Sequence, residues 1–155
     1  MRDLFYLEKE WLNSFPAHWK MSRLKDHTVT NTGITFTKAD LVEDGNAVLS
    51  YGQVHAKDNP RTKINHDLIK YIPDSLIQDK EGAKVKKGDY IFADTSEDLE
   101  GCGNCIYVNE DIDLYAGYHT TLLRNQSLKH GLYFAYLFTS APWRSQIPVS
   151  YTHLR

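Results

Sequence analysis

The chain has 155 residues, of which 41% are hydrophobic and 25% are charged, and this suits one globular domain with a sizeable core rather than a disordered chain. Its formal net charge is −2 and its sequence pI is near 6.4, which excludes the strongly basic class of proteins that bind nucleic acid through phosphate neutralisation alone. No run approaches the roughly 18 apolar residues of a membrane span, and residues 1–10 lack the apolar core of a signal peptide, so we expect a cytoplasmic protein.

The N-terminal apolar residues recur at spacings of about three and four, which predicts a short amphipathic helix that ends before Pro16. These residues are Leu4, Phe5, Leu7, Trp11 and Leu12. We therefore expect residues 1–18 to form an N-terminal helix and a lead-in segment, and Trp19 to anchor the core of a domain spanning 19–148.

The segment from residue 28 to residue 65 is predicted to contain strands and loops. Between residues 28 and 37, β-branched residues surround Gly33, which predicts a strand, a turn and a second strand. A turn at 44–46 precedes a predicted strand over 51–55, in which Gly52 is expected to mark a bulge or a close backbone approach. Residues 56–65 are polar and basic, which predicts an exposed loop.

The clearest pattern is a polar turn followed by a short apolar run. Lys87, Gly88 and Asp89 cannot continue an apolar segment, whereas residues 90–93 are apolar and rich in strand formers. The sequence therefore predicts a turn that leads into a buried strand. The chain becomes polar again from Asp94 onwards, so we expect a polar loop at the end of this strand. This loop is a candidate functional surface.

The remaining elements complete a β-rich order. Residues 68–72 favour a short strand or a helical turn, and residues 104–108 and 115–117 are predicted to pair around an acidic turn. Residues 120–123 are expected to continue the sheet, and residues 129–140 to form a helix. The predicted fold class is α+β, a β-rich mixed domain with a twisted sheet and a few short helices.

Cys102 and Cys105 have the C-x-x-C spacing at which two thiolates chelate zinc or exchange disulfides. The histidines show no paired ligand spacing, and no thioredoxin-like frame surrounds the pair. We therefore expect two reduced packing or turn cysteines and no metal site. A zinc- or thiol-dependent small enzyme that uses this pair stays open as an alternative.

Motifs of other enzymes are missing from the sequence. There is no P-loop, H-E-x-x-H or G-x-S-x-G motif. Asn59-Pro60-Arg61-Thr62 lacks the second proline and the aromatic residue of the motif that DNA amino-methyltransferases use. The sequence therefore predicts no catalytic residues and no cofactor.

Four sequence pieces occur in a fixed order. They are Phe15-Pro16-Ala17-His18-Trp19 with Leu24, the Lys-Gly-Asp turn with its strand and Ser/Thr loop at 86–96, Gly117-Tyr118-His119, and the aromatic segment 133–138. In this order they resemble the target recognition domain of the specificity subunit of type I restriction-modification systems. Gly117 and His119 resemble the family's Gly-x-His strand, which is architectural. Because Tyr118 and His119 alternate across such a strand, only one of them can face the core, and we expect a buried, hydrogen-bonded His119.

The resemblance also implies a function and partners. Such a domain docks in the major groove of double-stranded DNA and specifies one half of a bipartite site. Methylase subunits, which bind S-adenosylmethionine, and a motor-nuclease subunit would carry the chemistry. A specificity subunit contains two such domains separated by long helices, so we expect this chain to be a fragment or a half-subunit that dimerises.

Several predicted loops carry side chains that can hydrogen-bond to base edges. The first loop contains Gln53, His55, Lys57, Asn59, Arg61 and Lys63, the second contains Thr35, Thr37 and Lys38, and the third contains Thr95 and Ser96. The first is the strongest candidate, because most acidic residues cluster elsewhere and a local basic face is therefore possible. A β-rich protein-interaction module without a nucleic-acid role is a second alternative. Residues 149–155 resemble translated sequencing-adapter sequence, so we expect a non-native or disordered tail.

Overall fold

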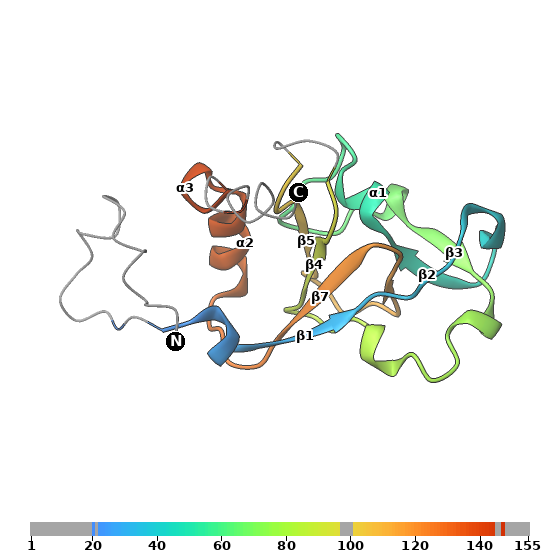
Figure 1. Cartoon of the computed structure of the whole chain (residues 1–155), viewed down its shortest axis with the longest axis horizontal. Helices are drawn as coiled ribbons and strands as arrows, with labels where there is room; N and C mark the ends of the chain where they lie inside the picture. The colour runs from blue at the N-terminus through green and yellow to red at the C-terminus, as the bar shows by residue number, and fades with distance from the viewer. Residues whose placement is uncertain (1–19, 21, 97–100, 145–146, 148–155) are drawn as a thin grey trace, which may run out of the picture.

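The computed structural model describes residues 20, 22–96, 101–144 and 147. Within these residues the chain forms seven strands in two sheets, together with three short α-helices and several 3-10 turns (Figure 1). The predicted α+β, β-rich fold is confirmed. The predicted helix around Leu4–Leu12, the anchor Trp19 and the tail from Val149 lie outside the described residues. No helix in the described part of the chain is long and apolar enough to cross a membrane.

The larger sheet is antiparallel and has the strand order β1-β7-β4-β5. Its strands are β1 (Thr28–Thr32), β7 (Thr120–Asn125), β4 (Tyr90–Ala93) and β5 (Cys105–Tyr107). Ile91 in β4 lies opposite Ile106 on one side and Leu122 on the other. All three side chains are fully buried, so the predicted buried strand is confirmed and lies at the centre of the core.

The smaller sheet has the strand order β3-β2-β6, with β3 antiparallel and β6 parallel to β2. Its strands are β2 (Asn46–Leu49), β3 (Lys70–Ile72) and β6 (Tyr115–Ala116). Leu49 and Ala116 from this sheet pack in the same cluster as Ile91 and Leu122 of the larger sheet. The two sheets therefore share one apolar core.

The Lys-Gly-Asp turn is fastened by a buried carboxylate. Asp89 is 1% exposed, and its Oδ2 accepts a hydrogen bond of 2.9 Å from the backbone N–H of Lys86. Its Oδ1 accepts one of 3.1 Å from the N–H of Asn125, and Arg124 Nε lies 3.4 Å from Oδ2. Gly88 has φ +96°, a conformation that favours glycine. Asp89 thus closes the turn and joins the start of β4 to the end of β7.

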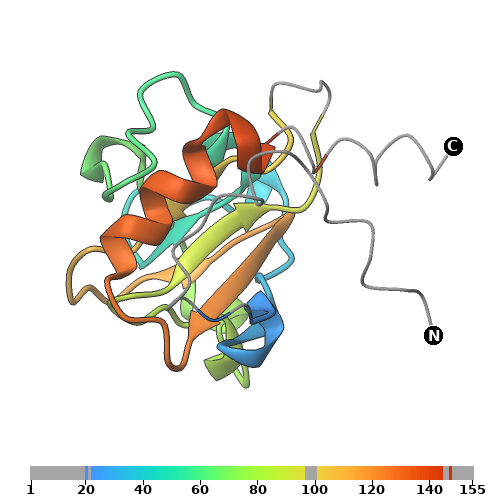
Figure 2. The same ribbon diagram turned by 90° about the vertical axis from the view of Figure 1, so that its left-hand side faces the viewer.

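Helix α2 (Gly131–Thr139) covers one face of the larger sheet (Figure 2). Phe138 and Ala135 pack against Tyr90 and Cys105 of the sheet, and the Tyr90 hydroxyl donates a hydrogen bond of 2.7 Å to the Gly131 carbonyl. The helix predicted over 129–140 is therefore confirmed. A further short helix, α3 (Ala141–Arg144), follows it.

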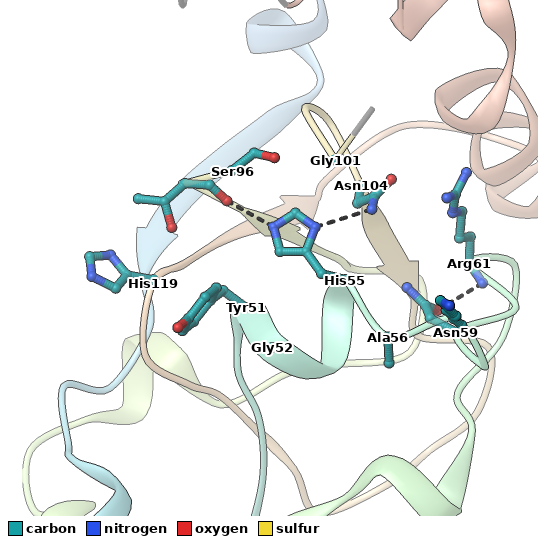
Figure 3. A pocket seen from close by; sticks show the side chains of 12 residues that line it. Tyr51, Gly52, His55, Ala56, Asn59, Arg61, Ser96, Gly101, Asn104 and His119 are labelled. Carbon is teal, nitrogen blue, oxygen red and sulfur yellow. Dashed lines mark hydrogen bonds between the residues drawn. The ribbon is translucent and has the colours of Figure 1, made fainter. Parts of the chain in front are cut away.

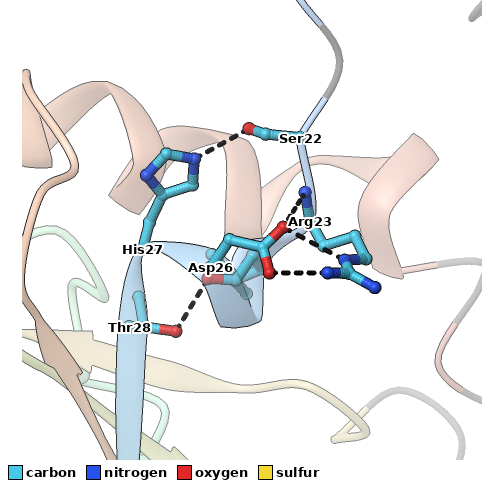
Figure 4. Close-up of polar contacts among 6 residues, drawn as sticks. Ser22, Arg23, Asp26, His27 and Thr28 are labelled. Carbon is cyan, nitrogen blue, oxygen red and sulfur yellow. Dashed lines mark hydrogen bonds and ion pairs between the residues drawn. The ribbon is translucent and has the colours of Figure 1, made fainter.

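Polar contacts fix the chain where it enters β1 (Figure 4). The imidazole of His27 hydrogen-bonds to Ser22 Oγ and to Ser127 Oγ, both at 2.8 Å, and so ties this segment to the chain just after β7. Arg23 donates two hydrogen bonds of 3.0 Å to the carboxylate of Asp26. The nearby Leu24 packs against the cluster that contains Phe138.

Residues 51–55 do not form the predicted strand. Tyr51–Val54 is the helix α1, which begins where Ser50 N donates to Gln53 Oε1 at 3.0 Å. This N-terminal cap outweighs the strand preference of the local side chains. A Cβ placed on Gly52 would meet nothing within 4 Å, so the expected bulge or close approach is also wrong.

Two predicted pairings are wrong as well. After β1 the chain leaves the larger sheet without forming a second strand. The backbone N–H of Ile34 instead donates a hydrogen bond of 2.8 Å to the carbonyl of Ala116 in the smaller sheet. The segments predicted to pair with each other, 104–108 and 115–117, lie in different sheets as β5 and β6. The expected exposed loop at 56–65 holds two buried residues, Asn59 and Ile64.

Candidate nucleic-acid interface

An open cavity of about 920 Å³ lies beside helix α1 (Figure 3). The segments that line it are α1, the loop that follows it, the ends of the β4–β5 connection and the turn before β7. Predicted DNA-contacting residues on its lining are His55, Lys57, Asn59, Arg61, Thr95 and Ser96. The fold therefore brings parts of two predicted loops, distant in sequence, to one place.

The other predicted residues lie elsewhere. Thr35, Thr37 and Lys38 are exposed but do not line the cavity. The Thr37 hydroxyl donates a hydrogen bond of 2.7 Å to Asp40 Oδ2. Lys63 is exposed outside the lining, and Gln53 uses its side-chain oxygen to accept from Ser50 N. The predicted second loop is thus separate from this cavity.

His55 is locked in position by both ring nitrogens. Nδ1 lies 3.1 Å from Asn104 Nδ2, and Nε2 lies 2.8 Å from the carbonyl oxygen of Thr95. Because an amide nitrogen only donates and a carbonyl only accepts, the neutral ring carries its proton on Nε2. His55 therefore joins α1 to the loop after β4, and neither nitrogen faces a ligand in this arrangement.

Asn59 holds the loop rather than exposing its amide. It is 8% exposed, and its Nδ2 donates to the carbonyls of Val54 at 2.7 Å and Cys105 at 3.2 Å. Its Oδ1 accepts from Arg61 N at 2.8 Å. Both amide hydrogens and one acceptor position are thus used within the protein, and Asn59 shapes the loop that presents Arg61.

Arg61 is the most constrained cation of the cavity. Its backbone has φ +63°, in the left-handed region. Its carbonyl accepts a hydrogen bond of 2.9 Å from the N–H of Tyr107 in β5. Partial burial lowers the pKa of the guanidinium, and the positive charge of Arg144 lowers it further. No acidic side chain among the described residues forms an ion pair with Arg61. The site therefore holds a positive charge that an anion would stabilise.

Aromatic rings form the other end of the cavity. The Tyr51 ring lies edge to face with His119 at 5.7 Å and with Tyr118 at 6.2 Å between centroids. The prediction that His119 is buried is wrong, because its side chain is 39% exposed. Its Nδ1 lies 3.2 Å from Asp94 Oδ1. The reason is that 117–119 link β6 to β7 as a turn, in which His119 has φ +52°. The alternation of a strand does not apply there.

Tyr51, Asn104 and His119 also line the cavity, although the sequence did not predict them as site residues. A helical interpretation of 51–55 was the available signal for Tyr51, because positions i and i+4 share a helix face and His55 was already a candidate. Asn104 carried no local signal, since its place depends on the pairing of β5 with β4.

The cysteine pair lies in the core. Cys102 and Cys105 are both buried, and burial raises the pKa of the Cys105 thiol to about 12. This thiol is therefore protonated at neutral pH, whereas the thiolate is the form that attacks or binds metal. Among the described residues, no group of three or more His, Cys, Asp or Glu side chains is placed to hold a metal ion.

No protein-family model matches the chain, and no curated protein matches it in sequence. The described lining of the cavity combines cations, hydroxyls, amides and aromatic rings, and it contains no carboxylate. Such a lining suits an anionic ligand better than a cationic one.

Proposed function

We propose that this chain is a DNA target recognition domain of a type I specificity subunit and that it specifies one half of a bipartite site. The observation that carries the proposal is that residues from 55–61 and 95–96, two segments predicted from sequence to contact DNA, line the same cavity. The described lining of that cavity contains no carboxylate. The ordered resemblance of four sequence pieces to that family supports it independently. The slightly acidic net charge is compatible with the proposal, because the cations are gathered locally.

Each side chain has a chemical role in this proposal. Arg61 donates to guanine O6 and N7 or to a phosphate, and Lys57 contributes an exposed charge near the backbone. Thr95 and Ser96 supply hydroxyl groups that can meet either kind of partner. Asn59 contributes indirectly, by fixing the loop backbone that carries Arg61.

The chemistry of the system would belong to other subunits. We propose double-stranded DNA, methylase subunits and a motor-nuclease subunit as partners, with the assembly acting on DNA in the cytoplasm. The chain itself would supply sequence preference and no catalytic group. It would need no cofactor of its own.

The test is base-by-base preference in the complete subunit with its methylase partner, measured as methylation of a library of randomised sites. We expect Arg61→Ala to cost about 1–3 kcal/mol of binding free energy: a base contact predicts a loss of preference at one base pair, and a phosphate contact predicts an equal loss for all sequences. Lys57→Ala should weaken binding to all DNA sequences by the same factor. It should also reduce the steepness of the plot of log affinity against log salt concentration by about one. The control Lys70→Ala, which changes an exposed residue outside the cavity, should change neither quantity. If Arg61→Ala and Lys57→Ala both leave the base preference and the salt dependence of binding unchanged, this surface does not contact DNA.

A protein-interaction module is the second candidate, and the exposed face of α2 favours it. Leu132, Tyr133 and Tyr136 are 49%, 55% and 60% exposed, although all three are large and apolar or aromatic. A double change of Leu132→Lys and Tyr136→Lys tests this face, because the Arg61 site lies elsewhere. Loss of assembly with the methylase subunit would assign α2 to protein contact, and intact assembly would remove that role.

A further inference from the structure

The cavity has two chemically different ends. Figure 3 shows Tyr51 and His119 on one side of His55 and Arg61 on the other. Its volume of about 920 Å³ lies within the range of roughly 300–1,000 Å³ that is typical of sites for small ligands. A ligand that spans the cavity therefore meets the Arg61 guanidinium at one end and the rings of Tyr51 and His119 at the other.

The cationic end favours an anion. Arg61 and Lys57 line the cavity, and no ion pair joins either of them to an acidic side chain in the described part of the chain. Arg144, from α3, is close enough for its charge to oppose that of Arg61. Two like charges near each other are relieved by an anion between or beside them. A phosphate group has the charge and the acceptor oxygens for this end.

The aromatic end favours a flat ring. Tyr51 meets His55, Tyr118 and His119 at interplanar angles of 78°, 74° and 87°, so none of these rings is stacked parallel to it. Nucleobases stack on such aromatic side chains, and they do so only when they are outside a base-paired stack.

The middle of the cavity carries the polar side chains of His55 and Asn104. The two nitrogens of His55 are engaged by Asn104 and Thr95. Asn104 Oδ1 is buried and has no hydrogen-bond partner among the described residues. An acceptor of this kind is satisfied by an N–H donor, which the edge of a base can bring after a small shift of the side chain.

We propose that this cavity holds a single unstacked nucleotide, with its phosphate beside Arg61 and its base against Tyr51. The inference rests on the proposed DNA recognition, because the nucleotide would come from a bound DNA strand. A free nucleoside monophosphate has the same chemistry and is separated from that source by the experiment below.

The experiment titrates the full chain with deoxyadenosine monophosphate and follows binding by calorimetry and by the NMR signals of the tyrosine and histidine rings. Arg61→Gln removes the charge and Tyr51→Leu removes the ring. Their matched controls are Lys70→Gln and Tyr71→Leu, which change exposed residues on β3 outside the cavity. Thermal unfolding of each variant checks that it is folded, and the ring signals of the unmodified chain need no variant at all.

We expect Tyr51→Leu to weaken binding by about fivefold or more through the loss of one base-stacking contact, and Arg61→Gln to do so through the loss of a charge-assisted hydrogen bond to the phosphate. The two controls should leave the affinity unchanged within about twofold. Deoxyadenosine and inorganic phosphate should each bind about tenfold more weakly than the monophosphate, because each lacks one half of the contacts. Absence of monophosphate binding, equal binding of inorganic phosphate, or equal effects of the controls would overturn the inference.

A second arm identifies the source of the nucleotide. The complete subunit is mixed with duplexes that carry the fluorescent base 2-aminopurine at single positions, and a change in fluorescence that depends on Tyr51 reports a base leaving the stack. Monophosphate binding without such a change would assign the site to free nucleotides and overturn the DNA source. Site preference that depends on Arg61, with neither monophosphate binding nor unstacking, would overturn this inference while leaving the proposed function standing.

Discussion

At the scale of single residues, the fold depends on a few buried polar side chains that each join two segments. Asp89 joins the Lys-Gly-Asp turn to the end of β7, and Asn59 joins the loop after α1 to β5. Buried polar groups are costly when their partners are lost, because the partners then lie away from water without a hydrogen bond. These two residues therefore matter for stability more than their small size suggests.

Replacing Asp89 tests this dependence. We expect Asp89→Ala to lower the free energy of unfolding by about 3 kcal/mol, because two backbone N–H groups and the charge of Arg124 lose their partner. Asp111→Ala, which changes an exposed aspartate, should cost less than about 0.5 kcal/mol. Urea unfolding of both variants measures the difference. Equal costs would contradict the role given to Asp89.

At the scale of elements, the short helix α1 decides which side chains face the cavity. In the predicted strand, Tyr51, Gln53 and His55 would share one face. In the helix, Tyr51 and His55 both line the cavity, while Gln53 closes the N-terminal cap outside it. A local error in the predicted element therefore changed which of three neighbouring residues belong to the site.

Two glycines beside this element should respond oppositely to the same change. A Cβ on Gly117 would lie 2.4 Å from Ser50 Oγ and 2.6 Å from Val48 Cγ2, so Gly117→Ala should cost about 1–3 kcal/mol. Gly52 is helical with open space around it, so Gly52→Ala should be neutral or stabilising by up to about 1 kcal/mol. Chemical unfolding of the two variants gives both values. Destabilisation of similar size in both would refute the packing described at the turn before β7.

At the scale of the whole molecule, the sequence predicted what is local and missed what is distant. The buried strand 90–93 and the helix around 131–139 were correct, because apolar runs and turn residues act within a few positions. The partners of β5 and β6 were wrong, because many distant segments can satisfy the same apolar pattern. For the site, the cationic loop was visible in the sequence, but its meeting with Tyr51, Asn104 and His119 required the sheet order.

The alkaline stability of the whole domain offers a further test. Burial raises the pKa of Cys105 from 9.0 to about 12, so between about pH 9 and 12 the unfolded state binds fewer protons than the folded state. Stability should therefore be unaffected by this thiol below about pH 9 and should fall above it, by at most about 1.4 kcal/mol per pH unit. Urea unfolding near pH 8, 9.5 and 10.5 should show a smaller loss for Cys105→Ala than for the unchanged chain. Tyr90, whose pKa is raised chiefly by burial, contributes to the loss in both proteins. Parallel losses would contradict a protonated buried thiol.

The loop that follows α1 is held by asparagine side chains and by backbone atoms. Asn59 and Asn65 donate to the carbonyls of Val54 and Asp58, and Asn109 Oδ1 accepts from the N–H of Ile64. The side chains of Lys57, Arg61 and Lys63 form none of the hydrogen bonds that fasten the described loop. These three side chains can therefore be exchanged without removing a hydrogen bond that holds the loop, so a few substitutions can change the charge and the hydrogen-bonding groups that an unchanged loop presents.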